Sequence, residues 1–400
     1  MSDWIERGTK VIMNTYKQFP IVLEKGNGIY LWDSDGKKYV DFVAGIAVNA
    51  LGYNDPDYIQ EIIAQLKKMQ HCSNLYWMMP SIELGEILIK NSCFDKIFYC
   101  NSGAEAVEAA IKLCKKYGKK VHGDNCHKII TMKRSFHGRT MATVTATGQT
   151  KYQKGFDPLM PGFSYVELNN FNELKGAVNE DTCAIIIEPI QGEGGIHPAE
   201  KSYLKKVRAL CDEKDIVLVF DEVQCGIGRT GELFAYQIFD VKPDVVSLAK
   251  GLGGGIPIGA MLAIQSKADA FQPGDHASTF GGNHLACTAG KVVLNKLLNG
   301  GILENVRKQG EYLKEKLATL KEKYAMIKDV RGYGLILGLE LNTPVKDIVE
   351  KSMEQGLLIL GAGENVIRFV PPLIISKNEI DEGISILDDV LQQNKNNKGL

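Results

Sequence analysis

Long hydrophobic runs are absent from this 400-residue sequence, since no apolar stretch approaches the roughly 18 residues that a membrane-spanning helix needs. The N-terminus carries Asp3, Glu6, Arg7 and Lys10 in place of the apolar stretch of a signal peptide. Nine cysteines are scattered along the chain, and no two of them form a Cys-x-x-Cys pair. An odd number without that spacing indicates reduced thiols rather than disulfides or zinc. We therefore expect a cytoplasmic protein with no membrane partner and no metal site.

A strong charge of one sign is also missing. The formal net charge is -1, which gives no electrostatic reason to expect nucleic acid as a partner. Two nucleotide fingerprints are absent as well. No Gly-Lys-Ser/Thr occurs, which excludes a P-loop, and Ile256 stands where the third glycine after Gly251 and Gly253 would complete a dinucleotide-binding motif. A nicotinamide-dependent oxidoreductase is therefore disfavoured.

What the sequence does contain is an alternation of apolar strands and amphipathic helices. A hairpin is predicted near the N-terminus, at residues 29–42. A helix is expected from residue 102 to Gly118, and a long helical region from about residue 286 to 324. The near-continuous apolar strands are expected at residues 97–100, 127–132, 183–187, 216–220 and 245–249. Such strands, separated by helices, predict an α/β fold with a mostly parallel sheet covered on both faces.

The length exceeds what one hydrophobic core usually supports, so we expect two domains. Residues 56–300 would form a large domain around the parallel sheet. Residues 1–55 and 301–400 would together form a smaller α+β domain, because the N-terminal hairpin and two later strand patterns lie outside the alternating region.

Lys250 is the first candidate for chemistry. It ends the apolar run 245–249 and is followed by Gly251, Gly253, Gly254 and Gly255, so it is expected at the carboxyl end of a buried strand. Desolvation there lowers the pKa of a lysine and favours the neutral amine, which condenses with aldehydes. Ligands of parallel sheets gather beyond this edge.

Other strands end in residues that suit the same ligand. Residues 101–104 (NSGA) open a helix directly after a strand, which creates an anion site suited to phosphate. Asp221 ends an apolar strand, where a protonated ring nitrogen would be a fitting partner. Phe136 could stack on a planar ring, and Arg139 and Arg368 could grip carboxylates. Together these features predict pyridoxal 5′-phosphate (PLP), joined to Lys250.

Nine ordered motifs also make the chain resemble the class III (subgroup II) PLP-dependent aminotransferases along nearly its whole length. They are residues 28–33 (GIYLWD), 41–48 (DFVAGIAV), 101–106 (NSGAEA), 135–140 (SFHGRT), 188–195 (EPIQGEGG), 221–224 (DEVQ), 250–255 (KGLGGG), 279–283 (TFGGN) and 367–372 (IRFVPP). The resemblance implies the PLP-dependent transferase fold of type I and a homodimer with active sites at the subunit interface.

The resemblance assigns roles at the cofactor. Lys250 would bind the aldehyde and move a proton, Asp221 would hold the ring nitrogen protonated, and Gln224 would reach the phenolic oxygen. Thr279 would come from the partner subunit to the phosphate. The remaining cofactor residues that it implies are Ser102, Gly103, Ala104, Phe136, Glu222 and Val223.

The resemblance also assigns roles at the substrates, an amino acid and a 2-oxo acid. Arg139 would bind one substrate carboxylate, with Ser278 and Tyr16 beside it. Arg368 would take the α-carboxylate of glutamate, and Glu193 would mask Arg368 when the amine donor is bound.

The motifs are most similar to those of family members that move the δ-amino group of N-acetylornithine to 2-oxoglutarate in arginine biosynthesis. Gly45 stands where ornithine transaminases usually have a tyrosine, which leaves room for an acetyl group. Transamination of 4-aminobutyrate, succinyl-diaminopimelate or ornithine stays open as an alternative. An isomerase of the glutamate-1-semialdehyde aminomutase type would share the cofactor residues but need no external 2-oxo acid.

Overall fold

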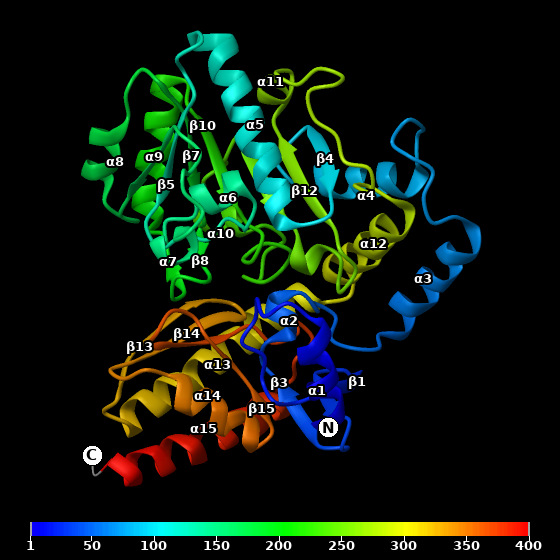
Figure 1. Cartoon of the computed structure of the whole chain (residues 1–400), viewed down its shortest axis with the longest axis vertical. Helices are drawn as coiled ribbons and strands as arrows, with labels where there is room; N and C mark the ends of the chain where they lie inside the picture. Colours follow the sequence, from blue (N-terminus) through cyan, green and yellow to red (C-terminus); the bar gives the residue numbers. More distant parts are fainter. Residues whose placement is uncertain (1, 399–400) are drawn as a thin grey trace.

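The computed structural model describes residues 2–398 and contains one large sheet together with three smaller ones. The large sheet and its helices form the upper part of the molecule in Figure 1, and both chain termini lie in the lower part. No helix in the described residues is long and apolar enough to cross a membrane.

The large sheet has seven strands, and six of them run parallel. β12 is the exception, since it pairs antiparallel with both of its neighbours. The strands, in spatial order, are β4 (Lys96–Cys100), β12 (Gly259–Ala263), β11 (Val245–Leu248), β10 (Val217–Asp221), β7 (Thr182–Ile187), β5 (Lys128–Met132) and β6 (Phe163–Val166). The predicted α/β fold with a mostly parallel sheet is confirmed.

Both faces of this sheet are buried, which explains why its strands are apolar without alternation. Val217 and Val219 pack in the same cluster as the buried face of one helix, α5, whereas Leu218 and Phe220 join the cluster on the opposite face. The surrounding helices and a small hairpin are α3 (Pro56–Lys68), α4 (Met79–Lys90), α5 (Gly103–His122), α6 (Met141–Ala146), α7 (Thr150–Gln153), α8 (Phe171–Ala177), α9 (Lys201–Lys214), α10 (Ala235–Phe239), η1 (Lys250–Leu252), α11 (Gln265–Ala268), α12 (His284–Asn299), β8 (Ile190–Gln191) and β9 (His197–Pro198).

The predicted end of the first long helix at Gly118 is wrong. Helix α5 continues to His122, and Gly123, at a φ of 93°, caps it. Gly118 is required for packing instead, because a Cβ there would lie 2.5 Å from the Cβ of Cys183 on β7. The glycine therefore lets the helix approach the sheet closely.

The N-terminal hairpin and the C-terminal part of the chain share a sheet, since β15 pairs with β3. The predicted long helical region is two helices, α12 and α13, separated by Gly300 and Gly301. The elements of this part are α1 (Ser2–Val11), β1 (Leu23–Asn27), β2 (Tyr30–Asp33), β3 (Lys38–Asp41), α2 (Ala44–Ala47), α13 (Ile302–Lys323), β13 (Ile327–Tyr333), β14 (Ile336–Leu341), α14 (Lys346–Glu354), β15 (Leu357–Leu358), β16 (Leu360–Gly361), β17 (Val366–Phe369) and α15 (Lys377–Lys398). The domain boundaries at residues 55 and 300 stay a prediction.

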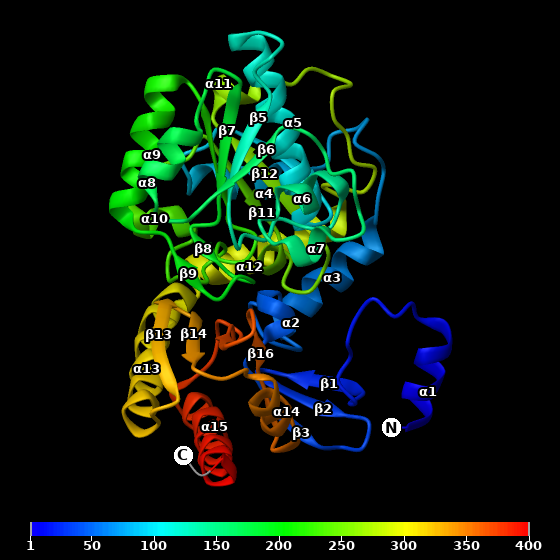
Figure 2. The same cartoon turned by 60° about the vertical axis from the view of Figure 1, so that its left-hand side comes forward.

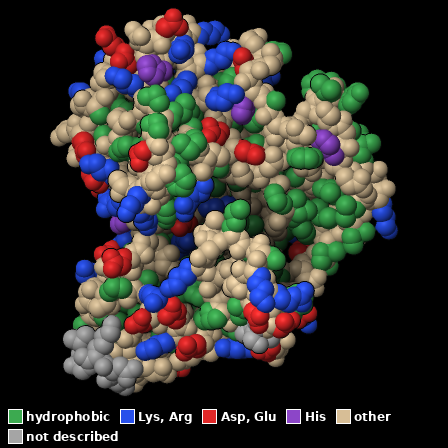
Figure 3. All heavy atoms as spheres, in the orientation of Figure 1, with side chains coloured by type: hydrophobic (Ala, Val, Ile, Leu, Met, Phe, Trp, Pro, Cys, Tyr) green, Lys and Arg blue, Asp and Glu red, His purple; other side chains and the backbone are tan. Residues whose placement is uncertain are grey.

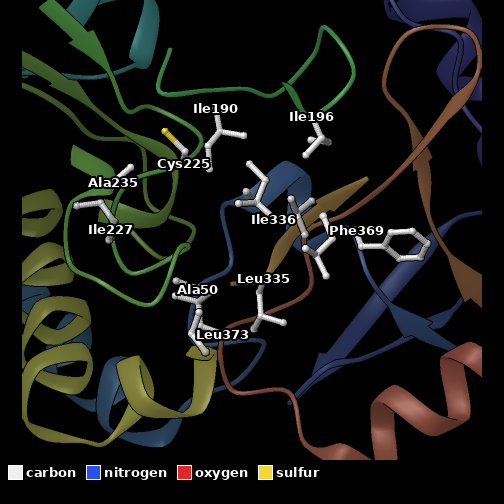
Figure 4. Packing of buried hydrophobic residues seen from close by; sticks show 14 of the residues in the cluster. Ala50, Ile190, Ile196, Cys225, Ile227, Ala235, Leu335, Ile336, Phe369 and Leu373 are labelled. Carbon is white, nitrogen blue, oxygen red and sulfur yellow. The ribbon is translucent and has the colours of Figure 1, made fainter. Parts of the chain in front are cut away.

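The two parts of the molecule are joined by a continuous hydrophobic core. Figure 4 shows Ile190 and Ile196, from the segment after β7, close to Ile336 on β14. The hairpin β8–β9 lies directly above β13 and β14 in Figure 2. The large sheet and the sheet β13-β14-β17-β16 therefore meet at the edge where the parallel strands end.

Candidate active site

A cavity of about 420 Å³ lies at the carboxyl edge of the large sheet. Five parallel strands each contribute a residue to its wall. These residues are Asn101 after β4, Phe136 after β5, Glu188 after β7, Asp221 at the end of β10 and Lys250 after β11. The parallel arrangement thus brings side chains from distant parts of the sequence to one site.

Lys250 occupies an unusual backbone conformation. It follows β11 at a φ of 43°, which is uncommon for a residue with a side chain and indicates a position that the surrounding structure imposes. Burial lowers the pKa of Lys250, against the opposing charge of Glu193, which raises it. The balance favours the neutral amine, which is the nucleophilic form.

Asp221 lies at the floor of the cavity and is held by two contacts. Its Oδ1 accepts a hydrogen bond from the backbone N–H of Val223 at 3.0 Å, and its Oδ2 lies 2.7 Å from Nδ1 of His137. Burial alone would lower the pKa of His137, but the hydrogen bond and charge of Asp221 outweigh it, so the pKa is raised. The hydrogen bond from His137 therefore stabilises a negative charge on the Asp221 carboxylate.

Glu188 is a third buried ionisable group in the same wall. Its Oε2 accepts from the N–H of Phe136 at 2.9 Å and its Oε1 from that of Gly192 at 3.2 Å. Burial raises the pKa of Glu188 to about 7, with the charge of His137 acting in the opposite direction. This carboxyl group links the segment that carries Phe136 to the loop after β7.

The start of α5 forms a cradle on one side of the cavity. Ser102 caps the helix, since its hydroxyl accepts from the N–H of Glu105 at 3.2 Å. A Cβ at Gly103 would lie 2.5 Å from Cγ1 of Val223, so only glycine lets the first turn approach that closely. The free N–H groups of this turn and the helix dipole favour an anion such as phosphate.

Aromatic rings cover another part of the wall. Phe136 packs edge-on against Tyr152 with ring centroids 5.5 Å apart. The guanidinium of Arg139 lies over both rings, 4.2 Å from the centroid of Tyr152 and 5.5 Å from that of Phe136. This stacking orients Arg139 at the mouth of the cavity while leaving its side chain exposed.

Arg368, which is buried, forms an ion pair with the half-buried Glu193 behind Gln224, a residue of the cavity wall. Arg368 donates hydrogen bonds to the Glu193 carboxylate and, at 3.0 Å, to Oε1 of Gln224. The Nε2 of Gln224 donates in turn to the Glu193 carboxylate at 3.2 Å. Burial would raise the pKa of Glu193, but the charge of Arg368 lowers it below its usual value. Gln224 connects this pair to the cavity that it lines.

Besides Glu193 and Arg368, four more of the predicted residues lie outside the cavity wall: Glu222, Tyr16, Ser278 and Thr279. Glu222 points to α10, where it accepts from the N–H groups of Ala235 at 2.6 Å and Tyr236 at 2.7 Å. Tyr16 is exposed and lines a second cavity of about 520 Å³ together with Gly45.

Ser278 and Thr279 lie in the loop before α12. Asn101 donates to the Ser278 hydroxyl at 3.1 Å and so connects this loop to the cavity. Thr279 is exposed.

Sequence reasoning missed His137 and Glu188 as functional residues. Both stand inside quoted motifs, next to Phe136 and at the start of residues 188–195. In a sequence, a histidine or glutamate near the end of a strand looks the same whether it serves a site or only packs in the core. The difference appears only when its partner in the fold is known. The partner of His137 is 84 residues away along the chain.

The residues present fit PLP. The cradle at Gly103 would take a phosphate, Asp221 would take a protonated ring nitrogen, and Phe136 offers an aromatic face. Lys250 supplies an amine with a lowered pKa in the same cavity. His137 Nε2, buried and without a hydrogen-bond partner among the described residues, is one further polar atom at this site.

Comparisons with known proteins agree with this chemistry. The family model Aminotransferase class-III matches residues 11–391. An acetylornithine aminotransferase from Caldanaerobacter subterraneus subsp. tengcongensis is 54% identical over 385 residues, which cover 96% of this chain and 98% of that protein.

Solved structures give the same picture. An ornithine aminotransferase from Toxoplasma gondii superimposes with a TM-score of 0.95 at 29% identity, covering 99% of this chain and 96% of that one. An N-acetylornithine aminotransferase from Stenotrophomonas maltophilia gives a TM-score of 0.84 at 39% identity, covering 97% and 98%.

Proposed function

Since the chain belongs to the class III aminotransferases, which depend on PLP, we propose that it is an acetylornithine aminotransferase. It would transfer the δ-amino group of N2-acetyl-L-ornithine to 2-oxoglutarate, giving N-acetyl-L-glutamate 5-semialdehyde and L-glutamate, as a step of arginine biosynthesis. The observation that carries this choice of substrate is the 54% identity to the C. subterraneus enzyme across nearly all of both chains.

PLP, when bound, supplies an aldehyde that condenses with amines and a ring that withdraws electrons from the reacting carbon of the substrate. Lys250 would then be the group that moves the proton, since its Nζ, with a lowered pKa, would take the proton from the reacting carbon and return it. Asp221, whose Oδ2 lies 2.7 Å from Nδ1 of His137, would stabilise positive charge on the ring nitrogen. Ser102, Gly103 and Ala104 would hold the phosphate at the start of α5.

The Glu193–Arg368 pair supports the use of two different substrates in one site. Glutamate brings an α-carboxylate that needs a free arginine, and Arg368 is buried beside the cavity with its charge matched by Glu193. When the ω-amine donor is bound, the pair stays closed and Arg368 is masked. When glutamate or 2-oxoglutarate is bound, its carboxylate replaces Glu193. Arg139, at the cavity mouth, would grip the carboxylate of acetylornithine, with help from Ser278 and from Tyr16, which in this chain lines the second cavity.

A homodimer with active sites at the subunit interface is part of the proposal. Large apolar side chains are exposed after α3 and in the loop before α12, including Leu75 at 87%, Trp77 at 94% and Phe280 at 60% exposure. In Figure 3 green side chains gather over α3, on the right-hand side. Such an apolar surface is typical of an interface, and Thr279 beside Phe280 would reach the partner's phosphate site. The nine free cysteines support a reducing, cytoplasmic location.

A panel of amine donors tests the substrate. Purified enzyme should transfer nitrogen from N-acetylornithine to 2-oxoglutarate with a higher kcat/KM than from ornithine, 4-aminobutyrate or succinyl-diaminopimelate. Ornithine is the most important alternative donor to test, because the structure of the Toxoplasma ornithine aminotransferase superimposes on this chain with a TM-score of 0.95. Turnover without any 2-oxo acid would instead indicate an isomerase.

Arg368→Ala tests the two-substrate switch in the same assays. The variant should impair the glutamate half-reaction far more than the acetylornithine half-reaction, because the acetylornithine half-reaction does not need a free Arg368. Equal losses in the two halves would count against the switch.

A further inference from the structure

The loop that carries Glu193 is held in place by hydrogen bonds from a residue outside the active site. β8 and β9 pair Gln191 with His197, so residues 192–196 form the tip of a short hairpin. This tip contains Glu193, whose carboxylate meets Arg368. The backbone of the same tip is gripped by another arginine, Arg331, on β13.

Arg331 makes three hydrogen bonds to tip carbonyls. Its Nε donates to the carbonyls of Gly195 at 3.0 Å and Ile196 at 2.9 Å, and its Nη2 donates to that of Gly195 at 2.7 Å. The guanidinium is itself fixed by Asp329 at 3.0 Å and Glu340 at 2.5 Å. With both carboxylates and both carbonyls in place, the planar group has little freedom to turn.

The strand register puts the two arginines on one face of the same sheet. Arg331 on β13 is opposite Gly338 on β14, and Gly338 is opposite Arg368 on β17. Directly opposed residues of antiparallel strands point to the same side. Arg331 and Arg368 therefore stand on either side of Gly338, about two strand spacings or ~10 Å apart.

Ile196 fills the space between these arginines. It is fully buried, and a Cβ on Gly338 would lie 2.9 Å from the Ile196 Cβ. Figure 4 shows Ile196 on the tip, close to the labelled Ile336 of β14. Ile196 has a φ of 53°, a costly conformation for a β-branched residue. The tip keeps this conformation because its surroundings impose it, and Arg331 bonds to the carbonyl of that very residue.

We propose that Arg331 is a positioning residue that holds the 192–196 tip so that Glu193 meets Arg368. It thereby sets the ratio of the rates of the two half-reactions. The inference rests on the proposed function of the Glu193–Arg368 pair as a switch. With Arg331 in place, the Glu193 carboxylate is presented to Arg368 in one geometry. Without it, the tip has several geometries, Glu193 masks Arg368 less well, and the closed state needed for the amine donor is weakened.

Arg331→Gln in the PLP-loaded enzyme tests this. The ratio of kcat/KM for acetylornithine to kcat/KM for glutamate should fall about tenfold, equivalent to ~1.4 kcal/mol. The dissociation constant of glutarate, a non-reacting dicarboxylate, should become several-fold lower by calorimetry, because Glu193 competes less well for Arg368. A ratio and a glutarate affinity that both stay at the parent values would overturn the proposal.

Arg208→Gln is the matched control. Arg208 is similarly half-buried, with 18% of its side chain exposed against 14% for Arg331, and it also bonds two carboxylates and a backbone carbonyl. It lies on α9, away from the tip. Loss of Arg208 should lower the melting temperature and leave the ratio unchanged, and a ratio that falls equally in this variant would mean that general destabilisation is the cause.

A double-mutant cycle separates this inference from the proposed switch. Glu193→Gln alone should lower the ratio, and Arg331→Gln should then add nothing to it. If Glu193→Gln lowers the ratio but Arg331→Gln lowers it further by the same factor, Arg331 does not act through Glu193 and the inference fails alone. If Glu193→Gln leaves the ratio unchanged, the switch itself fails.

Gly338→Ala is a second route in case Arg331→Gln does not fold. The added methyl would press on Ile196 and on Cγ1 of Val366 and so displace the tip, with both arginines left unsubstituted. The ratio should fall in the same direction, and an unchanged ratio in a folded variant would contradict the proposal.

Discussion

Individual side chains at this site have their properties set by burial and by one neighbour each. Lys250 loses its hydration, Glu193 gains the charge of Arg368, and His137 gains that of Asp221, so their pKa values move in different directions. The result is an amine with a lowered pKa and a half-buried ion pair within one small region. Such divergent shifts are typical of catalytic sites.

Lys250→Ala should reduce turnover by roughly 10⁴-fold, the upper end of what a positioned proton-transfer group contributes. PLP should still bind through Asp221 and the start of α5, but it should be removed by dialysis, which absorbance of the protein measures. Lys250→Arg, which keeps a charge but cannot form the neutral amine, should be equally inactive. Parent-like turnover in either variant would refute the assignment of Lys250.

Glu222 gives a prediction for stability against pH. Burial raises its pKa from the usual 4.5 to about 8, despite two hydrogen bonds from backbone N–H groups. As the pH rises, Glu222 loses its proton in the unfolded chain before it does so in the folded protein. The contribution of Glu222 to the free energy of unfolding is therefore fully present below pH 4.5 and is lost as the pH rises through about 8. Glu222→Gln should therefore show a smaller fall in melting temperature between about pH 5 and about pH 9. Part of the fall in melting temperature should remain, because the pKa of Glu188 is also raised, to about 7. If the melting temperature of Glu222→Gln falls with pH as steeply as that of the parent, Glu222 does not titrate in this range.

At the scale of elements, helix α5 is built for close approach at both ends. Gly103 lets its first turn reach Val223, and Gly118 lets its last turns pack on Cys183. The two glycines lower the intrinsic stability of the helix, by about 1 kcal/mol each relative to alanine. Their positions show that packing and ligand access, rather than helix propensity, decide these residues.

Gly103→Ala should weaken PLP binding by about tenfold or more, because the added Cβ would force Val223 or the first turn to move and misalign the N–H groups. The dissociation constant of PLP from the apoenzyme measures this. Gly176→Ala in α8 is the control, since its Cβ would meet nothing within 4 Å and should leave PLP binding unchanged. Parent-like PLP affinity in Gly103→Ala would argue against a phosphate at this helix start.

At the scale of the whole molecule, the apolar surface after α3 is the feature that a single chain leaves unexplained. Trp77, Leu75 and Met79 are each more than three-quarters exposed, and Phe280 lies in the neighbouring loop before α12. Burying such side chains against a second copy contributes about 1.5–3 kcal/mol for each large side chain. This contribution explains why the proposed active form is a dimer.

Trp77→Ser should raise the dimer dissociation constant by about tenfold or more and lower activity at low protein concentration. Sedimentation velocity over a dilution series measures both species. Val121→Ser, which removes a 46%-exposed apolar residue near the end of α5, should leave the dimer intact. A Trp77→Ser dimer as tight as the parent would exclude this surface as the interface.

The sequence by itself determined the alternating α/β architecture and the chemistry at the strand ends. Apolar runs followed by Asn101, Asp221 or Lys250 are local patterns, and parallel strands must place their carboxyl ends at one edge. The nine motifs added the family. These predictions needed no knowledge of which distant residues touch.

Tertiary structure alone decided the pairings across the chain. Asp221 and Glu222 are adjacent, yet one faces the cavity and the other faces α10, because neighbouring residues at a strand end point to opposite sides. His137 meets Asp221, and Arg331 meets the tip 135 residues away, through strand register and loop path. No local periodicity carries that information, since it depends on how the sheets pack against each other.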